Sequence, residues 1–437
     1  MAHFQNVFEE LKWRGVVFDS TPGAAEVLAS EKVTCYAGFD PTAKSLHIGN
    51  LVPIMGLVRM QRHGHSPIAI VGGGTGMIGD PSGRSEERQL LTPLHIEENV
   101  AGIRGQLERF LDFDSKSNRA RLINNADWLL KTRLIEFLRD IGKHFTVNQM
   151  LGRESVRSRI DRDSGISYTE FSYMLLQAYD FLKLYEDHGC TFQMGGSDQW
   201  GNILGGVDLI RRVHGTLPQG DGPGANRAHG IVYPLITTAA GEKFGKSVGG
   251  APTLDPNETS PYRLYQFFLN AADQDVVKYL KLFTLLEPPA IAEMEEAVRA
   301  EPKKREAQNR LAEEVTRMIH GTDGLDKARR VTHSLFGDDI SALSASELED
   351  VFADAPGGQV SRTGLEDGLT VQSLVVGQQV CKSGGEVRRL LAQGGLYLNG
   401  ERIQDPQRRV TVDDFIDGQL LVLRRGAKNY HLVRLVE

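Results

Sequence analysis

Up to about residue 235, short apolar runs alternate with helical patterns, and this feature most constrains what the chain can fold into. We predict strands at Val33–Phe39, Ile68–Val71, Leu122–Ile123, Thr191–Met194 and Ile231–Ile236. Helical spacing appears in two sets, Leu51, Ile54, Met55, Val58 and Phe171, Met174, Leu175, Ala178, Leu182. Strands that alternate with helices favour an α/β fold with a parallel, doubly wound sheet.

The remainder of the chain changes pattern three times. A Gly-rich loop covers Gly241–Pro261, helical patterns follow to Phe352, and Asp354–Gly368 has the composition of a linker. A basic helix at Gly385–Gln393 and short strands at Leu396–Leu398, Gln419–Leu423 and Tyr430–Leu435 end the chain. We therefore predict a Rossmann-like domain at 1–233, a loop and connector at 234–260, a helical domain at 261–352, a linker at 353–370 and a small α/β domain at 371–437.

Charge and cysteine content limit the function classes. The net charge is −7, yet residues 371–437 carry 10 Lys+Arg against 7 Asp+Glu, which indicates a basic module that faces RNA or DNA. Cys35, Cys190 and Cys381 lie far apart, which excludes a disulfide framework and a CxxC zinc site, so we expect buried thiols and no protein-bound metal. The N-terminus lacks a signal peptide and no run is long enough to span a membrane, so we expect a cytoplasmic protein.

Two segments resemble phosphate-binding patterns, but the first has the wrong context and the second lacks a residue. Gly74, Gly76 and Gly79 match GxGxxG, which would indicate a dinucleotide-binding dehydrogenase, but Asp80-Pro81 follows at once and suits a turn. Lys246-Ser247 resembles the end of a P-loop, but the pattern needs glycine where Ala240 stands.

A third segment carries more specific chemistry. Residues 36–50 leave the first strand and enter a helix, and a helix N-terminus attracts anions. Thr42, His47 and Asn50 add side-chain donors there, and Lys243 and Lys246 on the Gly-rich loop suit a cation clamp on polyphosphate. Taken singly, the same residues are compatible with an ordinary helix cap and a solvated basic turn.

Together these blocks resemble a known enzyme family. Tyr36-xx-Phe39-Asp40-Pro41-Thr42, His47-Ile48-Gly49-Asn50 and Lys243-Phe244-Gly245-Lys246-Ser247 resemble the two signatures of class I aminoacyl-tRNA synthetases. Residues 169–180 and 195–202 are similar to the bacterial tyrosyl-tRNA synthetase family. The first signature usually ends in a second histidine; Asn50 still offers a neutral donor there.

The resemblance implies a site for each substrate. Tyr36 and Asp180 would hold the phenol of L-tyrosine, which favours a phenol over the indole of a tryptophan-specific relative. The ammonium side would be held by Asp80, Tyr173 and Gln177, with Gln193 and Gln199 nearby. Gly38, Asp40, Gly196 and Asp198 would contact the adenosine half of ATP, with His47 and Lys246 on its phosphates. On a helix, Tyr173, Gln177 and Asp180 share one stripe, although a solvated polar face has the same spacing.

The same resemblance implies a mechanism and partners. The substrate carboxylate would attack the α-phosphorus of ATP with Mg²⁺ present, while Thr42, His47, Lys243 and Lys246 stabilise the leaving pyrophosphate. A tRNA(Tyr) ribose hydroxyl would then accept the tyrosyl group. Residues 371–437 resemble an S4-like RNA-binding domain that presents Lys382, Arg388 and Arg389, and the helices at 261–352 would lie against the anticodon arm. Arg84 and Arg88 are weaker acceptor-stem candidates, and the family forms homodimers through residues 120–165. A catalytically silent RNA binder is the alternative from another class, and Asn50 is its only support.

Overall fold

The computed structural model describes residues 4–82, 91–160, 165–216, 227–241, 244–245, 251–336, 340–353, 355–426 and 429–437. The chain divides into two compact units. Unit 1 comprises Met1–Thr259 and Phe267–Ile319, and unit 2 comprises Ser260–Gln266 and His320–Glu437. Among the described residues, no helix is both long and apolar enough to cross a membrane.

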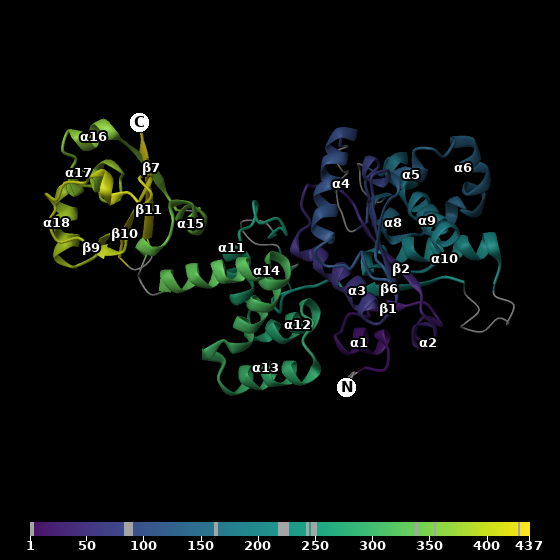
Figure 1. Ribbon diagram of the computed structural model, residues 1–437. Helices are drawn as coiled ribbons and strands as arrows, with labels where there is room; N and C mark the ends of the chain where they lie inside the picture. The colour runs from purple at the N-terminus through teal and green to yellow at the C-terminus, as the bar shows by residue number, and fades with distance from the viewer. Residues whose placement is uncertain are drawn as a thin grey trace. The chain divides into compact units, whose positions relative to one another are not determined.

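Unit 1 is built on a six-stranded sheet (Figure 1). Its strands are β1 (Asp19–Ser20), β2 (Thr34–Phe39), β3 (Ser66–Val71), β4 (Arg121–Asn124), β5 (Cys190–Gly196) and β6 (His229–Tyr233), in the spatial order β1-β6-β5-β2-β3-β4. Strands β2 to β6 pair in parallel and β1 is antiparallel to β6. The predicted parallel, doubly wound sheet is confirmed, and the five predicted strands form with slightly shifted ends.

Helices cover both faces of this sheet, as the alternation of side chains along parallel strands requires. Its helices are α1 (Val7–Trp13), α2 (Ala24–Ser30), α3 (Leu51–Arg62), α4 (Pro93–Leu107), α5 (Ala126–Leu129), α6 (Leu134–Asp140), α7 (Val147–Leu151), α8 (Glu154–Ile160), α9 (Tyr168–His188) and α10 (Trp200–His214). Tyr36, Ile68 and Ile70 join Phe181 of α9 in one core cluster. On the other face, Gly56 of α3 meets Tyr233 and Met194 so closely that no larger residue would fit.

The predicted helical stretch after residue 261 forms as expected. It contains α11 (Pro261–Leu269), α12 (Asp273–Phe283), α13 (Pro288–Ala300), α14 (Glu306–Phe336) and α15 (Ala345–Val351). The boundary between the two units falls within α11 and within α14, so each of these two helices is divided between the units. Gly321, with φ of 73°, interrupts the helical backbone of α14 beside that boundary.

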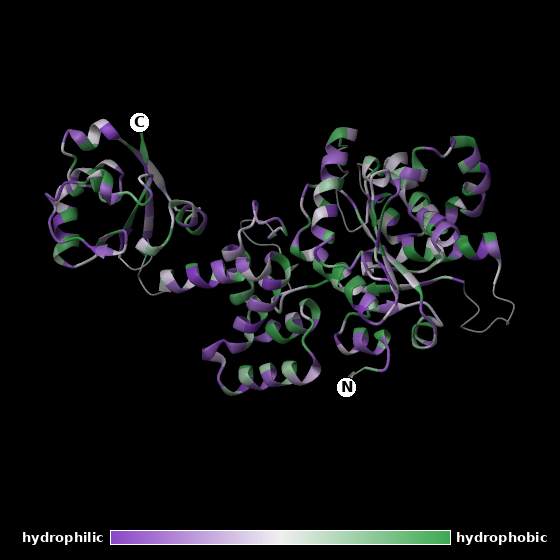
Figure 2. Cartoon of the chain, viewed as in Figure 1, coloured by the Kyte–Doolittle hydropathy of each residue, from purple (hydrophilic) through white to green (hydrophobic). Residues whose placement is uncertain are grey.

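Unit 2 contains a five-stranded sheet in the order β7-β11-β10-β8-β9. The strands are β7 (Gly357–Ser361), β8 (Leu396–Leu398), β9 (Glu401–Arg402), β10 (Leu420–Arg425) and β11 (Asn429–Val436), with helices α16 (Arg362–Glu366), α17 (Val371–Gly377) and α18 (Gly384–Ala392). Part of the stretch predicted as a linker is therefore regular structure, since β7 pairs in parallel with β11. In both units helices show apolar colour on one side and polar colour on the other (Figure 2).

The three cysteines are buried and free, as predicted.

Candidate active site

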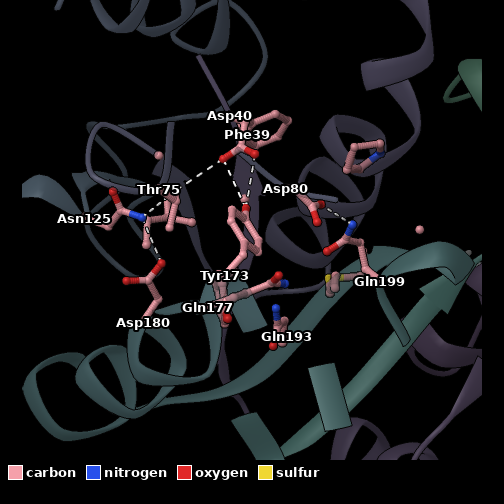
Figure 3. Close-up of a pocket in the computed structure, with 18 residues that line it drawn as sticks. Phe39, Asp40, Thr75, Asp80, Asn125, Tyr173, Gln177, Asp180, Gln193 and Gln199 are labelled. Atoms are coloured by element: carbon pink, nitrogen blue, oxygen red, sulfur yellow. Dashed lines mark hydrogen bonds between the residues drawn. The ribbon is translucent and has the colours of Figure 1, made fainter. Parts of the chain in front are cut away.

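A pocket opens at the carboxyl ends of β2, β3 and β5. At β2 the order of the strands changes direction: β3 and β4 lie on one side of it, and β5 and β6 on the other. Open α/β sheets bind ligands at such a switch point, because the two neighbouring crossovers leave a crevice there. The pocket has a cavity volume of about 180 Å³, more than ten times the roughly 10–15 Å³ that one water molecule needs, so a small organic group fits. Side chains from β2, β5, α9 and the strand-end loops line it (Figure 3).

Asp180 of α9 lies in the pocket wall and is 4% exposed. The Trp128 indole N–H donates to its Oδ1 at 2.7 Å, and the Asn125 amide donates to its Oδ2 at 2.8 Å. A carboxylate has about four lone-pair positions, so these two bonds leave room for a further donor. Asp180 can therefore accept a hydrogen bond from a ligand.

Burial shifts the acidity of this group strongly. It raises the pKa of Asp180 to about 7, although the hydrogen bonds from Asn125 and Trp128 act in the opposite direction. Burial, with Asp180 nearby, also raises the pKa of the Tyr36 hydroxyl well above its ordinary value. Near neutral pH the pocket thus pairs a protonated phenol with a carboxyl group that is protonated in part of the molecules.

Two buried polar atoms of the pocket lack protein partners. Within the described part of the chain, the Tyr36 hydroxyl and Gln193 Oε1 make no hydrogen bond, although both residues line the pocket. They come from register neighbours on adjacent strands, Tyr36 on β2 and Gln193 on β5. Unpaired buried polar atoms cost free energy, so their position favours a polar ligand.

A second polar group lies on the side of the pocket formed by Asp40. The hydroxyls of Tyr173 and Thr75 both donate to the Asp40 carboxylate, at 3.1 Å and 3.3 Å (Figure 3). Thr75 also accepts from Asn125, which links this carboxylate to Asp180. Burial, followed by the nearby Asp40 and Asp80 carboxylates, raises the pKa of Tyr173, which therefore stays protonated.

Asp80 and two glutamines complete the lining. Gln199 donates to Asp80 Oδ2 at 2.6 Å, and Asn202 donates to Gln177 Oε1 at 2.8 Å. Acidic oxygens and amide groups gathered in this way suit a cationic group of a ligand.

The structure brings most of the predicted substrate residues into this one pocket. Its lining includes every residue predicted for tyrosine, namely Tyr36, Asp80, Tyr173, Gln177, Asp180, Gln193 and Gln199, together with Gly38, Asp40 and Gly196. The stripe on α9 is consequently a pocket wall rather than a solvated face. Asp198, on the short turn Ser197–Gln199, is exposed beside Gly196, where any side chain on Gly196 would strike its carboxylate.

Residues 47–50, at the end of the first signature, form a helix cap outside the pocket lining. His47 Nδ1 accepts from the Gly49 N–H at 3.0 Å, and Asn50 Oδ1 accepts from the His47 N–H at 3.0 Å. Asn50 thus uses its oxygen to hold the turn that leads into α3. Thr42 and His47 are exposed.

Residues 252–254, which follow the second signature in the chain, lie beside residues 46–48 of the first. Ile48 N–H donates to Pro252 O at 2.9 Å, and Leu254 N–H donates to Leu46 O at 2.8 Å. Lys243 and Lys246 themselves lie outside the described residues, as do Arg84 and Arg88.

The GxGxxG match has a structural explanation. Its residues lead into a short 3-10 turn, Thr75–Met77. A side chain on the preceding Gly72 would strike Thr75 and Asp40, and one on Gly76 would press on Pro41. The glycines therefore let this loop approach the Asp40 segment closely.

Sequence reasoning missed Thr75, Asn125 and Trp128, which hydrogen-bond the Asp40 and Asp180 carboxylates. One signal was present, because Asn125 comes two residues after the predicted strand Leu122–Ile123, and such strand ends build ligand sites. In unit 2, Lys382, Arg388 and Arg389 are exposed at and beside α18, opposite the buried Val387 and Leu391.

Comparison with known proteins agrees with this geometry. The family model described as tRNA synthetases class I (W and Y) matches residues 28–337, and the Tyrosine--tRNA ligase SYY-like C-terminal domain matches residues 347–433. A tyrosine–tRNA ligase from Roseiflexus castenholzii is 50% identical over 98% of this chain and 99% of its own, and one from Rhodopirellula baltica is 47% identical over 98% and 96%. The solved structure of a C-terminally truncated mitochondrial tyrosyl-tRNA synthetase from Coccidioides posadasii is 35% identical, with a TM-score of 0.66 over 75% of this chain and 92% of that chain.

Proposed function

The chain belongs to the class I tRNA synthetases as a tyrosine–tRNA ligase, and from this membership we propose how its pocket selects and activates tyrosine. The enzyme uses ATP to join tyrosine to tRNA(Tyr). One observation carries the proposed selectivity: the buried Tyr36 hydroxyl and the Asp180 carboxylate share one pocket. A tyrosine phenol can donate to Asp180 while its oxygen accepts from Tyr36. Phenylalanine would leave both protein groups unpaired, and tryptophan has no hydroxyl for Tyr36.

The substrate ammonium group would lie on the carboxylate side of the pocket. Asp80 and the Tyr173 and Gln177 oxygens are its acceptors in this proposal, with Gln193 and Gln199 beside them. The hydrogen bond between Asp80 and Gln199 supports it, because it orients the carboxylate before the substrate binds. An ammonium group anchored here points the substrate carboxylate away from the phenol site.

ATP would bind towards the glycines at the strand ends. Gly38 and Gly196 leave space for the adenosine half, and Asp40 and Asp198 are acceptors for its hydroxyl groups. Mg²⁺ enters with ATP as part of that substrate. The tyrosine carboxylate, already ionised near neutral pH, attacks the α-phosphorus in line, so this step needs positioning rather than a base.

Charge on the departing pyrophosphate would be stabilised by the two signatures. Thr42, His47 and the Asn50 amide are the donors of the first, and Lys243 and Lys246 the cations of the second. The backbone bonds that join residues 46–48 to 252–254 support this role, because they keep the two segments together.

Unit 2 would bind tRNA through its basic surface. Lys382, Arg388 and Arg389 are exposed, and contacts of this kind hold phosphates without reading sequence. The predicted domain boundaries, including a helical anticodon-arm domain at 261–352, and the cytoplasmic location stay predictions.

We further propose a homodimer formed through residues 120–165. Apolar side chains are exposed across α5, α6 and α7, and Leu134 and Ile135 are 69% and 73% exposed. Other members of this patch are Leu130, Leu138, Val147 and Leu151. An apolar surface of this kind is typical of a protein interface, and a second copy of the chain is the partner proposed.

The test of the activation step is ATP–pyrophosphate exchange with purified enzyme. We expect exchange with tyrosine and none above background with phenylalanine or tryptophan. Equal exchange with phenylalanine would contradict the roles of Tyr36 and Asp180, whereas absent exchange in a folded protein that binds tRNA would favour the silent RNA binder.

A further inference from the structure

The backbone after the second signature runs beside the first signature. Two hydrogen bonds, Ile48 N–H to Pro252 O and Leu254 N–H to Leu46 O, and a bridge between His47 and Thr253 make this link. It holds the C-terminal side of the Gly-rich loop. The described residues on the loop's N-terminal side, 236–241 and 244–245, take no part in this bridge, so that side requires a separate anchor.

That anchor is α12. Its Asp275 carboxylate, 6% exposed, accepts from the Ala239 N–H at 3.0 Å, and Lys278 donates to Thr237 O at 3.0 Å. Phe244, which stands between the two signature lysines in the sequence, is buried against Tyr279 and Phe283, with ring centroids 4.9 Å and 5.0 Å away. Polar bonds and aromatic packing thus both tie this side of the loop to one helix.

The other end of α12 is held by α3, the helix that begins directly after the first signature. The fully buried Arg59 of α3 donates to the carbonyls of Lys281, Leu282 and Thr284, at 3.1, 2.7 and 3.2 Å. Arg14 donates to two of the same carbonyls and to Leu286 O. A guanidinium at this position satisfies helix C-terminal carbonyls and their partial negative charge.

These contacts close a ring. Within the described residues, it passes from the first signature along α3 to Arg59, through α12 to Phe244 and Gly245, and back to the first signature at Ile48, whose side chain would lie 3.4 Å from a Cβ on Gly245. Along the helices, Asn50 to Arg59 spans about 13 Å and Asp275 to Leu282 about 10 Å, so the two helical segments are of similar length. The links are packed or hydrogen-bonded contacts, buried at Arg59, Asp275 and Phe244 and exposed at Lys278. Through them α12 connects the described parts of the two signatures.

We propose that α12 sets the distance between the two ATP-contacting signatures, with Asp275 and Arg59 as positioning residues for the activation step. The proposal rests on the proposed role of both signatures at the pyrophosphate. Neither residue lines the tyrosine pocket. Displacing a phosphate-contacting group by about 1 Å is enough to slow catalysis strongly, so loosening the ring acts on ATP and not on tyrosine.

The experiment compares three variants of the full enzyme in tyrosine-dependent exchange. Asp275→Ala removes the bond to Ala239 N–H and should lower kcat/KM for ATP about tenfold, with KM for tyrosine unchanged. Asp275→Asn keeps an acceptor oxygen at that position and should restore most of the loss. Gln274→Ala, at the exposed neighbouring position, should behave as the unsubstituted enzyme.

A second set of variants changes Arg59, which holds the C-terminal end of α12. Arg59→Lys should reduce the same constant, and combining it with Asp275→Ala should cost less than the product of the two effects, because both uncouple one ring. Multiplicative effects, or a loss that falls equally on tyrosine and ATP and tracks the melting temperature, would overturn the proposal. If the unsubstituted enzyme exchanges normally and Asp275→Ala does so equally well, the positioning role alone is rejected. If the unsubstituted enzyme shows no exchange, the proposed function is rejected.

Discussion

Replacing Tyr36 with phenylalanine removes one oxygen from the pocket and should move stability and specificity in opposite directions. Tyr36 is 2% exposed, and within the described residues its hydroxyl has no hydrogen-bond partner. A buried unpaired donor costs about 1–3 kcal/mol, so the ligand-free variant should gain on the order of 1 kcal/mol of unfolding free energy. The ring is retained, so its edge contact with Phe181, at 5.2 Å between centroids, is kept.

The same oxygen is proposed to donate to the phenol of tyrosine. A hydrogen bond between neutral groups contributes about 0.5–1.5 kcal/mol, so the ratio of kcat/KM for tyrosine over phenylalanine should fall roughly 2- to 13-fold. Both quantities are measured on one preparation: the free energy of unfolding by urea unfolding without substrate, and the specificity ratio by pyrophosphate exchange with each amino acid.

Tyr233 provides a matched control for this substitution. Its hydroxyl is likewise buried and makes no hydrogen bond within the described residues, but it packs against α3 and does not line the pocket. Tyr233→Phe should therefore stabilise the protein and leave specificity unchanged. The reasoning is refuted if Tyr36→Phe lowers stability, keeps the full preference for tyrosine, or matches Tyr233→Phe in both assays.

Three further predictions concern other parts of the molecule. Burial raises the pKa of Asp180 from 3.8 to about 7, so the folded state binds this proton more tightly than the unfolded state. The free energy of unfolding should therefore fall by about 4 kcal/mol as pH rises from 4 through 7. Urea unfolding of Asp180→Asn should lack this pH dependence, and an identical dependence in the variant would contradict the prediction. Leu134→Glu with Ile135→Glu should convert a dimer into monomers in sedimentation, and an unchanged dimer would place the interface elsewhere. Arg388→Ala with Arg389→Ala should reduce the salt slope of log K for tRNA by about 2 and leave pyrophosphate exchange intact; an unchanged slope would remove α18 from the RNA surface.

Periodicity explains which elements were predictable. The strands around Tyr36 and Gln193 are apolar runs bounded by turn residues, and the stripe on α9 follows from 3.6 residues per turn. The strands β1, β7 and β9 were missed because they are only two to five residues long and contain polar residues or glycine, so they show no hydrophobic alternation. β7 exists because β11 offers it a pairing edge, which is a tertiary cause.

The sequence by itself determined the residue types and the spacing of the signatures, and their resemblance to a known family gave the expectation of tyrosine, ATP and tRNA as substrates. Helix stripes and strand ends were predictable because they are local properties of a chain. Only the tertiary structure decided which groups tune the pocket and which hold α12: Asn125 and Trp128 reach Asp180 across 55 and 52 residues, and Arg59 reaches Leu282 across 223. Such contacts depend on strand order and helix packing, which bring distant segments together without a pattern that either segment carries alone.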